Sequence, residues 1–168
     1  MSKSSRRKLQ AASWFAVVRA YQECTRRYAQ LLRSFDLTIP QFDVMNAIDQ
    51  LADQATPKDI ADQLVVTRGN ITGVLQRLQE RSLITTRHNE QDGRSIVCHL
   101  TGPGRALLDQ ARAAAALFVE TQLAPFDDDE LRDTENQMNR MRSHLKTIDP
   151  GTIVSQALER TRQAAAEA

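Results

Sequence analysis

Long apolar runs are absent from this sequence of 168 residues. A helix that crosses a membrane needs about 18 or more consecutive apolar residues, and the apolar stretches here are far shorter. Residues 1–8 are polar and basic, and the apolar segment of a secretory signal does not follow them. We therefore expect a cytoplasmic protein with no membrane partner.

Cysteine and histidine are also scarce, which limits redox and metal chemistry. The two cysteines, Cys24 and Cys98, lie far apart, and without an export signal we expect two reduced thiols. The three histidines, His88, His99 and His144, lack the local spacing of metal ligands. The sequence therefore predicts no metal site and no other cofactor.

An excess of one charge is absent as well, since 22 Lys and Arg stand against 21 Asp and Glu. A uniformly basic chain would indicate a nucleic-acid partner, so any such surface here must be local. Two basic clusters are candidates, one in residues 3–8 and one formed by the arginines between residues 68 and 94. The alternative interpretation of both clusters is a solvated face.

Motifs of common enzyme classes are missing. The chain contains no G-x-S-x-G, no G-x-x-x-x-G-K-[ST] and no H-E-x-x-H pattern, and its glycines do not follow a buried parallel strand. We therefore expect no catalytic residues and no enzymatic activity.

The residues that are present favour helices. From about residue 9 to Phe35, apolar residues recur at alternating spacings of four and three, which predicts one long helix with a wide apolar stripe. Residues 1–8 before it are expected to form a disordered basic arm. Near the other end, Asp127–Glu130 forms a capping box for a helix that Pro150-Gly151 is expected to end. The extension over residues 149–168 is expected to be helical and frayed.

The middle of the chain carries helix start signals and then changes its period. Thr38–Gln41 is a capping box that starts one helix, and Thr56-Pro57 gives the same start signal for a second. Thr67 is placed to cap a third helix that runs to about Arg81. Two short β-prone runs follow, separated by a polar turn-forming segment over residues 88–94, which predicts a β-hairpin. Two short helices, a tight turn at Val65-Val66 and a hairpin predict a winged helix-turn-helix over residues 37–101.

The third of these helices begins with small and polar residues, which suits entry into the DNA major groove. An arginine at the hairpin tip suits the narrow, negatively charged minor groove. The candidate DNA-binding residues are Lys58, Thr67, Arg68, Gly69, Asn70, Thr72, Gly73, Gln76, Arg77, Arg87, Asp92, Gly93, Arg94 and Ser95. Taken singly, the helix start could be a plain cap and Asp92-Gly93 a plain hairpin turn.

Three stretches resemble the core of MarR-family (multiple antibiotic resistance regulator) proteins. They are L-V-V-T-R-G-N-I-T-G-V-L-Q-R-L-Q-E-R-S-L-I-T-T-R, D-G-R and L-T-G-P-G-R-A-L. The resemblance covers roughly residues 10–148. It implies a mainly α fold with a small β-hairpin wing and an obligate homodimer with intertwined terminal helices. It further implies a transcriptional regulator that leaves a pseudo-palindromic double-stranded operator on binding a small ligand or on oxidation. Ser82 departs from the glycine usual after the recognition helix, which puts the local turn in doubt.

The predicted domain organisation follows from the apolar stripes. A winged domain of this size cannot cover the stripes of both terminal segments, so residues 9–36 and 102–148 are predicted to be dimerisation helices. A repressor released by a small aromatic or anionic effector is the favoured function. Candidate effector-binding residues, for which core packing is the alternative role, are Trp14, Arg19, Tyr21, Tyr28 and His99.

Two alternatives to an effector-released repressor remain. The first is a redox-responsive regulator acting through Cys24, assisted by Arg26 and Arg27, although peroxide-sensing members of the family carry their cysteine about where Trp14 stands. Cys98 is expected to serve packing in a wing strand. The second alternative is a winged-helix module that binds proteins and has lost DNA binding.

Overall fold

The computed structural model describes residues 2–88 and 96–166, apart from the side chain of Lys3. Its described part is mainly helical with one two-stranded antiparallel hairpin, as the sequence predicts. The elements are α1 (Lys3–Arg33), α2 (Ile39–Leu51), the 3-10 turn η1 (Ala52–Gln54), α3 (Pro57–Leu64), α4 (Arg68–Glu80), β1 (Ile84–His88), β2 (Ile96–Leu100), α5 (Gly102–Leu123), α6 (Asp128–Leu145) and α7 (Pro150–Ala166). Two compact units divide the chain after Thr121, and each is described by itself.

The first helix begins earlier than the sequence suggested. Residues 1–8 were expected to be a disordered arm, but from Lys3 onward they belong to α1. Ser2 is the N-cap residue, and its hydroxyl accepts a hydrogen bond of 3.2 Å from the Ser5 amide. This cap satisfies one of the free amides of the first turn, and Lys, Arg, Leu and Ala then continue the helix readily. The expectation of disorder was therefore wrong for the helical part of the arm.

The capping signals place the starts of the next helices correctly. The Thr38 amide donates to Gln41 Oε1 at 2.9 Å, and the Gln41 amide donates back to Thr38 Oγ1, so the capping box is complete. Thr56 caps α3 by accepting from the Asp59 amide at 3.2 Å. Thr67 is the N-cap residue of α4, but its side chain makes no capping hydrogen bond. Thr67 is therefore the N-cap residue, as predicted, but its side chain does not bond the helix amides.

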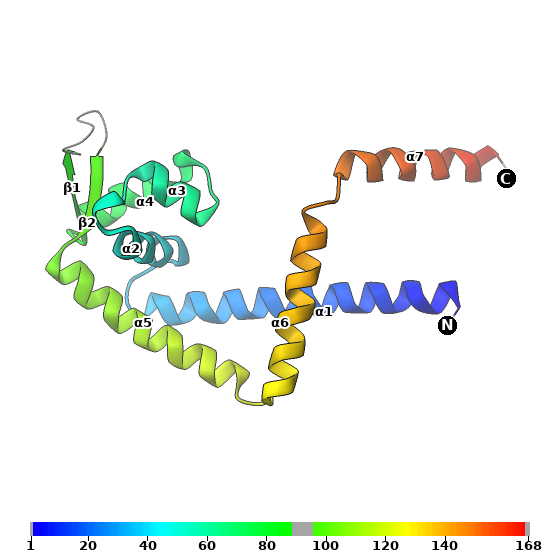
Figure 1. Ribbon diagram of the computed structural model, residues 1–168, viewed down its shortest axis with the longest axis horizontal. Helices are drawn as coiled ribbons and strands as arrows, with labels where there is room; N and C mark the ends of the chain where they lie inside the picture. The colour runs from blue at the N-terminus through cyan, green and yellow to red at the C-terminus, as the bar shows by residue number, and fades with distance from the viewer. Residues whose placement is uncertain (1, 89–95, 167–168) are drawn as a thin grey trace. The chain divides into compact units, whose positions relative to one another are not determined.

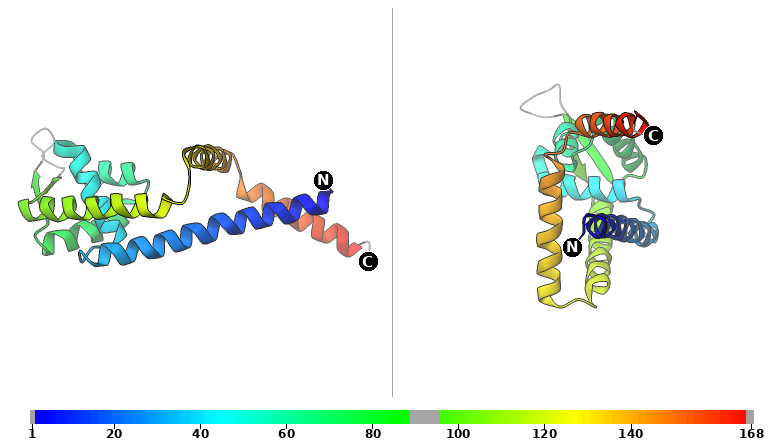
Figure 2. Two further views of the ribbon diagram at one scale, coloured as in Figure 1. Left: turned by 90° about the horizontal axis from the view of Figure 1, so that it is seen from below. Right: turned by 90° about the vertical axis from the view of Figure 1, so that its right-hand side faces the viewer.

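In the described part of the first unit, one hydrophobic core joins the winged domain to α1 and α5. Figures 1 and 2 show α3, α4 and the hairpin gathered around α2, which follows the C-terminal end of α1, with α5 leading away from β2. The largest fully buried side chains come from α1, α2, α3, α4, β2 and α5, and they include Leu32, Met45, Ile60, Leu78, Cys98 and Leu108. The Cys98 amide donates to the Ala55 carbonyl at 2.9 Å, which ties β2 to the segment before α3.

The connection from α4 through β1 to α5 is tightly packed. Ser82 has φ of 56°, so it adopts the left-handed conformation that its position requires although it is not glycine. The Thr101 hydroxyl donates to the Ser82 carbonyl at 2.8 Å and accepts from the Gly104 amide at 3.0 Å. A Cβ on Gly104 would lie 1.9 Å from the Leu83 carbonyl oxygen, so only glycine fits there.

A charged network joins α2 to α5. Asp49 binds Arg105 at 2.6 Å through one carboxylate oxygen and Arg112 at 2.5 Å through the other. Hydrogen bonding from Arg112, and then from Arg105, holds the pKa of the Asp49 carboxyl below its usual range. Arg112 also donates to Asn46 Oδ1 at 2.6 Å, which fixes its guanidinium against α2. The winged domain is therefore attached to α5 by ionic as well as apolar contacts.

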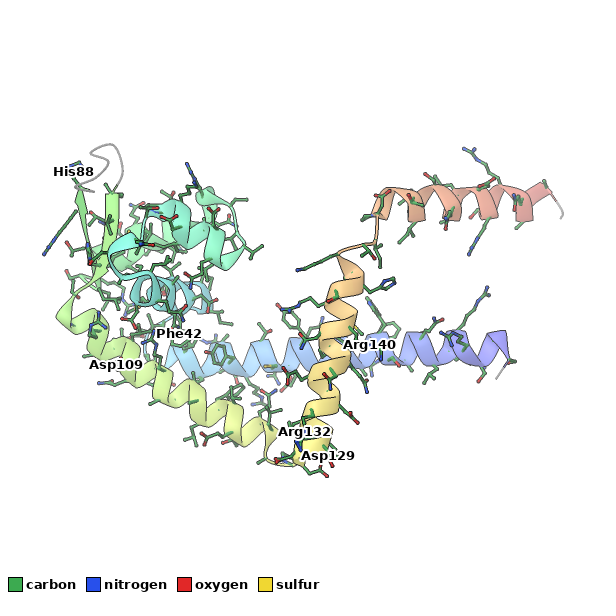
Figure 3. All side chains as sticks on the ribbon, in the orientation of Figure 1. Phe42, His88, Asp109, Asp129, Arg132 and Arg140 are labelled. Carbon is green, nitrogen blue, oxygen red and sulfur yellow. The ribbon has the colours of Figure 1, made fainter. Side chains whose placement is uncertain are left out.

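The second unit contains α6 and α7. Asp127 forms the predicted capping box with Glu130, and Asp129 pairs with Arg132 one turn along α6 at 3.2 Å (Figure 3). α6 ends at Leu145, before Pro150-Gly151, and Pro150 instead opens α7. The predicted role of Pro150 as a helix terminator was therefore wrong, because Asp149 accepts from the Gly151 and Thr152 amides and caps a new helix.

Neither α6 nor α7 contains a buried residue. Apolar side chains on both helices and on their connection are exposed, and these are Met138, Met141, Leu145, Ile148, Ile153, Val154 and Leu158. Among the described helices, none combines the length and apolar character needed to cross a membrane.

Candidate nucleic-acid interface

Helix α4 presents the predicted DNA-binding residues on one exposed face. Ile71, Leu75 and Leu78 are buried, so that side of the helix faces the core. Because a helix repeats every 3.6 residues, the residues between them point outward. All seven predicted residues of α4 are exposed, and they are Arg68, Gly69, Asn70, Thr72, Gly73, Gln76 and Arg77.

The polar atoms on this face are partly held within the helix. The Thr72 hydroxyl donates to the Arg68 carbonyl at 3.1 Å, which leaves its oxygen free to accept. Gln76 donates through Nε2 to Glu80 at 3.0 Å, so its amide is oriented along the helix. Arg68 lies at the N-terminus of α4, the positive end of the helix dipole, and a helix N-terminus suits phosphate oxygens. Thr67, immediately before α4, and Lys58, in the first turn of α3, are exposed as well.

Two glycines on the exposed face have no role in packing. A Cβ on Gly69 would approach only Thr67 Oγ1, at 4.0 Å, and a Cβ on Gly73 would meet nothing within 4 Å. Neither residue has a positive φ. Glycine inside a helix destabilises it by about 1 kcal/mol relative to alanine. Gly104, by contrast, is sterically required, so the fold needs glycine at position 104 but not at positions 69 and 73.

The hairpin carries basic residues at the described end of β1. Arg87 pairs with Val97 and His88 with Ile96 in the antiparallel register, and both basic side chains are exposed. Figure 3 shows His88 at the end of its strand. The remaining wing candidates, Asp92, Gly93, Arg94 and Ser95, lie outside the described residues.

Two side chains that set the relative placement of these elements escaped the sequence interpretation. Gln79 Nε2 donates to Thr86 Oγ1 at 3.1 Å, which connects α4 to the wing strand. Arg81 donates to the Asp36 carbonyl at 2.6 Å, which connects the end of α4 to the turn after α1. Neither contact has a sequence signature, because the partners are polar surface residues that meet only in the fold.

The predicted effector-binding residues lie in different environments. Tyr28 is half-buried beside Phe42 and Phe118, with ring centroids 6.1 and 5.5 Å away, and burial raises the pKa of its hydroxyl. Trp14 and Tyr21 are 59% and 70% exposed on α1. At 1.5 Å of rise per residue, Trp14 and Tyr28 are separated by roughly 21 Å along α1, so within one chain they do not line one small pocket.

The other two effector candidates lie apart from these aromatics. The Arg19 guanidinium lies 5.8 Å from the centre of the Phe15 ring, over its face. His99 contributes to a small polar pocket between α2, η1, β2 and the start of α5, which Asp49, Asp53 and Arg105 also line. The carboxylate of Asp49 in that pocket is already bound by two arginines.

The cysteines differ in their surroundings. Cys98 is fully buried, and burial raises the pKa of its thiol to about 11, so it remains protonated at neutral pH, as expected of a packing residue. Cys24 is half-buried on α1. Arg26 and Arg27 both bind the Glu23 carboxylate, at 2.6 and 2.8 Å, and lower its pKa. Both guanidinium groups are therefore engaged by Glu23. In the described part of the chain, no three His, Cys, Asp or Glu side chains gather as metal ligands.

Comparison with known proteins places this fold in a family. A MarR-family sequence profile matches residues 35–95. An organic hydroperoxide resistance transcriptional regulator of Bacillus subtilis is 30% identical over 104 residues, which is 62% of this chain and 70% of that protein. An uncharacterized HTH-type transcriptional regulator of Bacillus cereus is 30% identical over 125 residues, which is 74% of this chain and 80% of that protein.

Solved structures share the fold. A Staphylococcus aureus MepR–DNA complex superimposes with a TM-score of 0.71 at 22% identity, covering 77% of this chain and 96% of that one. Bordetella bronchiseptica BpsR, whose DNA binding is regulated by 6-hydroxynicotinic acid, gives 0.66 at 25% identity, covering 76% and 91%. The curated relatives are transcriptional regulators rather than enzymes. The chain therefore belongs to the MarR family of winged-helix DNA-binding transcriptional regulators.

Proposed function

We propose that this protein is a homodimeric repressor that binds a pseudo-palindromic operator through two copies of α4 and leaves it when a small anionic ligand binds. One observation carries the proposal above the others. The exposed face of α4 combines polar side chains with two glycines that the fold itself does not need. A surface of that kind allows a helix to approach the floor of the major groove closely.

The DNA contacts are assigned by chemistry and position. Arg68 and the N-terminal end of α4 are suited to phosphates or guanine edges, and Asn70 and Gln76 to adenine edges. Thr67, Thr72 and Arg77 flank them, while Lys58 on α3 is suited to the phosphate backbone. On the wing, the expected contacts to the minor groove are Arg87 and the segment Asp92–Ser95, with Arg94 at its centre.

The homodimer is supported by apolar surface that a single chain leaves open. Along α1 the exposed large apolar residues are Leu9, Trp14, Phe15 and Tyr21, and α6 and α7 bury no residue of their own. Helices with exposed apolar stripes and no core cannot offset the entropy of ordering their backbone. A second copy of the chain would cover both surfaces and place two recognition helices on one duplex.

DNA binding is tested with a fluorescent duplex enriched from a random pool by the wild-type protein. Arg94→Ala and Arg68→Ala should each weaken binding by about 1–3 kcal/mol without changing the melting temperature. Arg162→Ala, which removes an exposed arginine from α7, is the matched control and should bind as the wild type does. Affinity should also fall steeply with salt, because each neutralised phosphate releases counterions. Failure of the wild type to enrich any duplex would refute the proposed function.

The effector proposal rests on BpsR, which matches this chain at 25% identity and is regulated by an aromatic acid. We expect a phenolic or purine anion to lower operator affinity, with Trp14, Arg19, Tyr21, Tyr28 and His99 as the candidate contacts. Titration of the protein–operator complex with a panel of such anions, 6-hydroxynicotinic acid included, tests this expectation. A panel that leaves operator affinity unchanged would remove the effector from the proposal and leave DNA binding standing.

A further inference from the structure

The turn between α3 and α4 contains a valine that the fold does not favour. Val65 adopts a left-handed conformation, with φ of 55° and ψ of 44°. The Val66 amide donates to the Ala61 carbonyl at 3.0 Å and the Val65 amide to the Asp62 carbonyl at 3.3 Å. This pair of bonds is a Schellman motif, whose left-handed position is usually glycine. A β-branched residue is strained there, because its Cβ substituents crowd the backbone.

The Val65 side chain contributes no packing to the hydrophobic core. It is 90% exposed, the highest value among the exposed large hydrophobic residues of the chain's described part. Within the described portion of residues 37–101, only Val66 and Ile96 share this character, at 42% and 39%. Val65 therefore destabilises the chain through backbone strain, and its exposed side chain gains almost no stabilising burial in return. Such a residue needs an explanation outside the folded monomer.

The position of Val65 indicates what covers it. It lies three residues before Arg68, at the end of α4 that carries the proposed DNA contacts. The exposed apolar surface is one or two side chains wide, too small to hold a protein partner by itself. The major groove of a duplex offers apolar groups of matching size, namely the C5-methyl groups of thymine.

We propose that Val65 packs against a thymine methyl group and selects a T·A pair at one position of each operator half-site. The inference rests on the proposed function, since it requires α4 to enter the major groove. Strain at this turn then has a functional reason: glycine would relax the backbone but would remove the methyl groups that contact the base. Val65 is a specificity-determining residue that acts through apolar contact, beside the hydrogen-bonding residues of α4.

The test combines protein variants with modified DNA. Val65→Gly removes both the strain and the side chain, so its melting temperature should rise by about 2–4 °C. Its affinity for the enriched duplex should fall roughly three- to tenfold, through the loss of one apolar contact. Ser82→Gly is the matched control, because it relieves a second left-handed non-glycine residue, with φ of 56°, at the opposite end of α4. It should gain stability and keep wild-type DNA affinity.

Replacing each thymine of the enriched duplex in turn by deoxyuridine removes one methyl group at a time. At one position per half-site, this change should weaken wild-type binding by the same factor as Val65→Gly and should not weaken Val65→Gly further. A Val65→Gly variant that binds as tightly as the wild type would overturn the inference. So would a loss that no deoxyuridine position reproduces. In both cases salt-dependent binding by the wild type would leave the proposed function intact.

Discussion

Gly73→Ala is expected to change the stability of the fold and its DNA affinity in opposite directions. Gly73 lies in the interior of α4, where alanine is more favourable by about 1 kcal/mol. An added Cβ would meet nothing within 4 Å, so no internal clash offsets this gain. For a chain of this length the gain corresponds to a rise of about 2–4 °C in melting temperature.

The same methyl group should weaken DNA binding. If the backbone of α4 approaches the groove floor at Gly73, the added group occupies space that the duplex needs, and overpacking of this kind costs about 1–3 kcal/mol. That range corresponds to a loss of roughly 5- to 150-fold in affinity. Thermal melting by circular dichroism and fluorescence anisotropy with the enriched duplex measure the two effects on one preparation.

A matched control is available in α5. Gly102 also has open space around an added Cβ and lies outside the proposed interface. Gly102→Ala should therefore leave DNA affinity unchanged. The reasoning is refuted if Gly73→Ala raises the melting temperature and binds the duplex as tightly as the wild type. The glycine would then have no partner to accommodate.

Three further predictions follow from the packing of the fold. Gly104→Ala should destabilise the protein by roughly 2–3 kcal/mol, because its Cβ would meet the Leu83 carbonyl oxygen at 1.9 Å; urea unfolding measures this, and unchanged stability would contradict the geometry. The pKa of Asp49 is lowered in the folded protein, so its ion pairs stabilise the fold above the unfolded carboxyl pKa, and this stability is lost as the pH falls through the lower folded pKa. The free energy of unfolding, measured with urea between about pH 7 and pH 2, should therefore decline less steeply with acid in Asp49→Asn than in the wild type. Identical slopes would count against the ion pairs. The only tryptophan, Trp14, is 59% exposed in one chain, so its fluorescence emission should shift to longer wavelength when a dimer is diluted to monomers. If the emission maximum is that of an exposed indole at every protein concentration, α1 is not buried in a partner.

Local chemistry explains which parts of this fold the sequence revealed. The capping boxes at Thr38 and Asp127 involve groups within three residues of each other, so the pattern alone places the helix starts. The same reasoning missed the start of α1, because Ser2 precedes a basic segment that resembles a disordered arm in composition. It also missed that Asp149 begins a new helix beside Pro150.

Contacts between distant segments were beyond sequence reasoning. The Asp49 pairs with Arg105 and Arg112 span 56 and 63 residues, and no periodicity predicts which surface charges will meet. For the candidate interface, hydrophobic spacing placed the residues of α4 on an exposed face correctly, because the buried positions dictate the remainder. The effector candidates were chosen by residue type, and α1 spreads its aromatic residues along its length. Residue type alone cannot supply that geometry.

The left-handed residues show where sequence rules and function diverge. Asp36 adopts φ of 53° with a side chain that tolerates this conformation, and Ser82 replaces the glycine that the turn favours. Ala52 also has a positive φ, of 48°. Val65 is the only β-branched residue of these four, and it stands just before a helix that carries two glycines without internal need. Strain, exposed apolar surface and poor helix formers thus fall within nine consecutive residues, Val65–Gly73. Selection for stability alone would remove each of them, which is the physical reason to place the duplex against this segment.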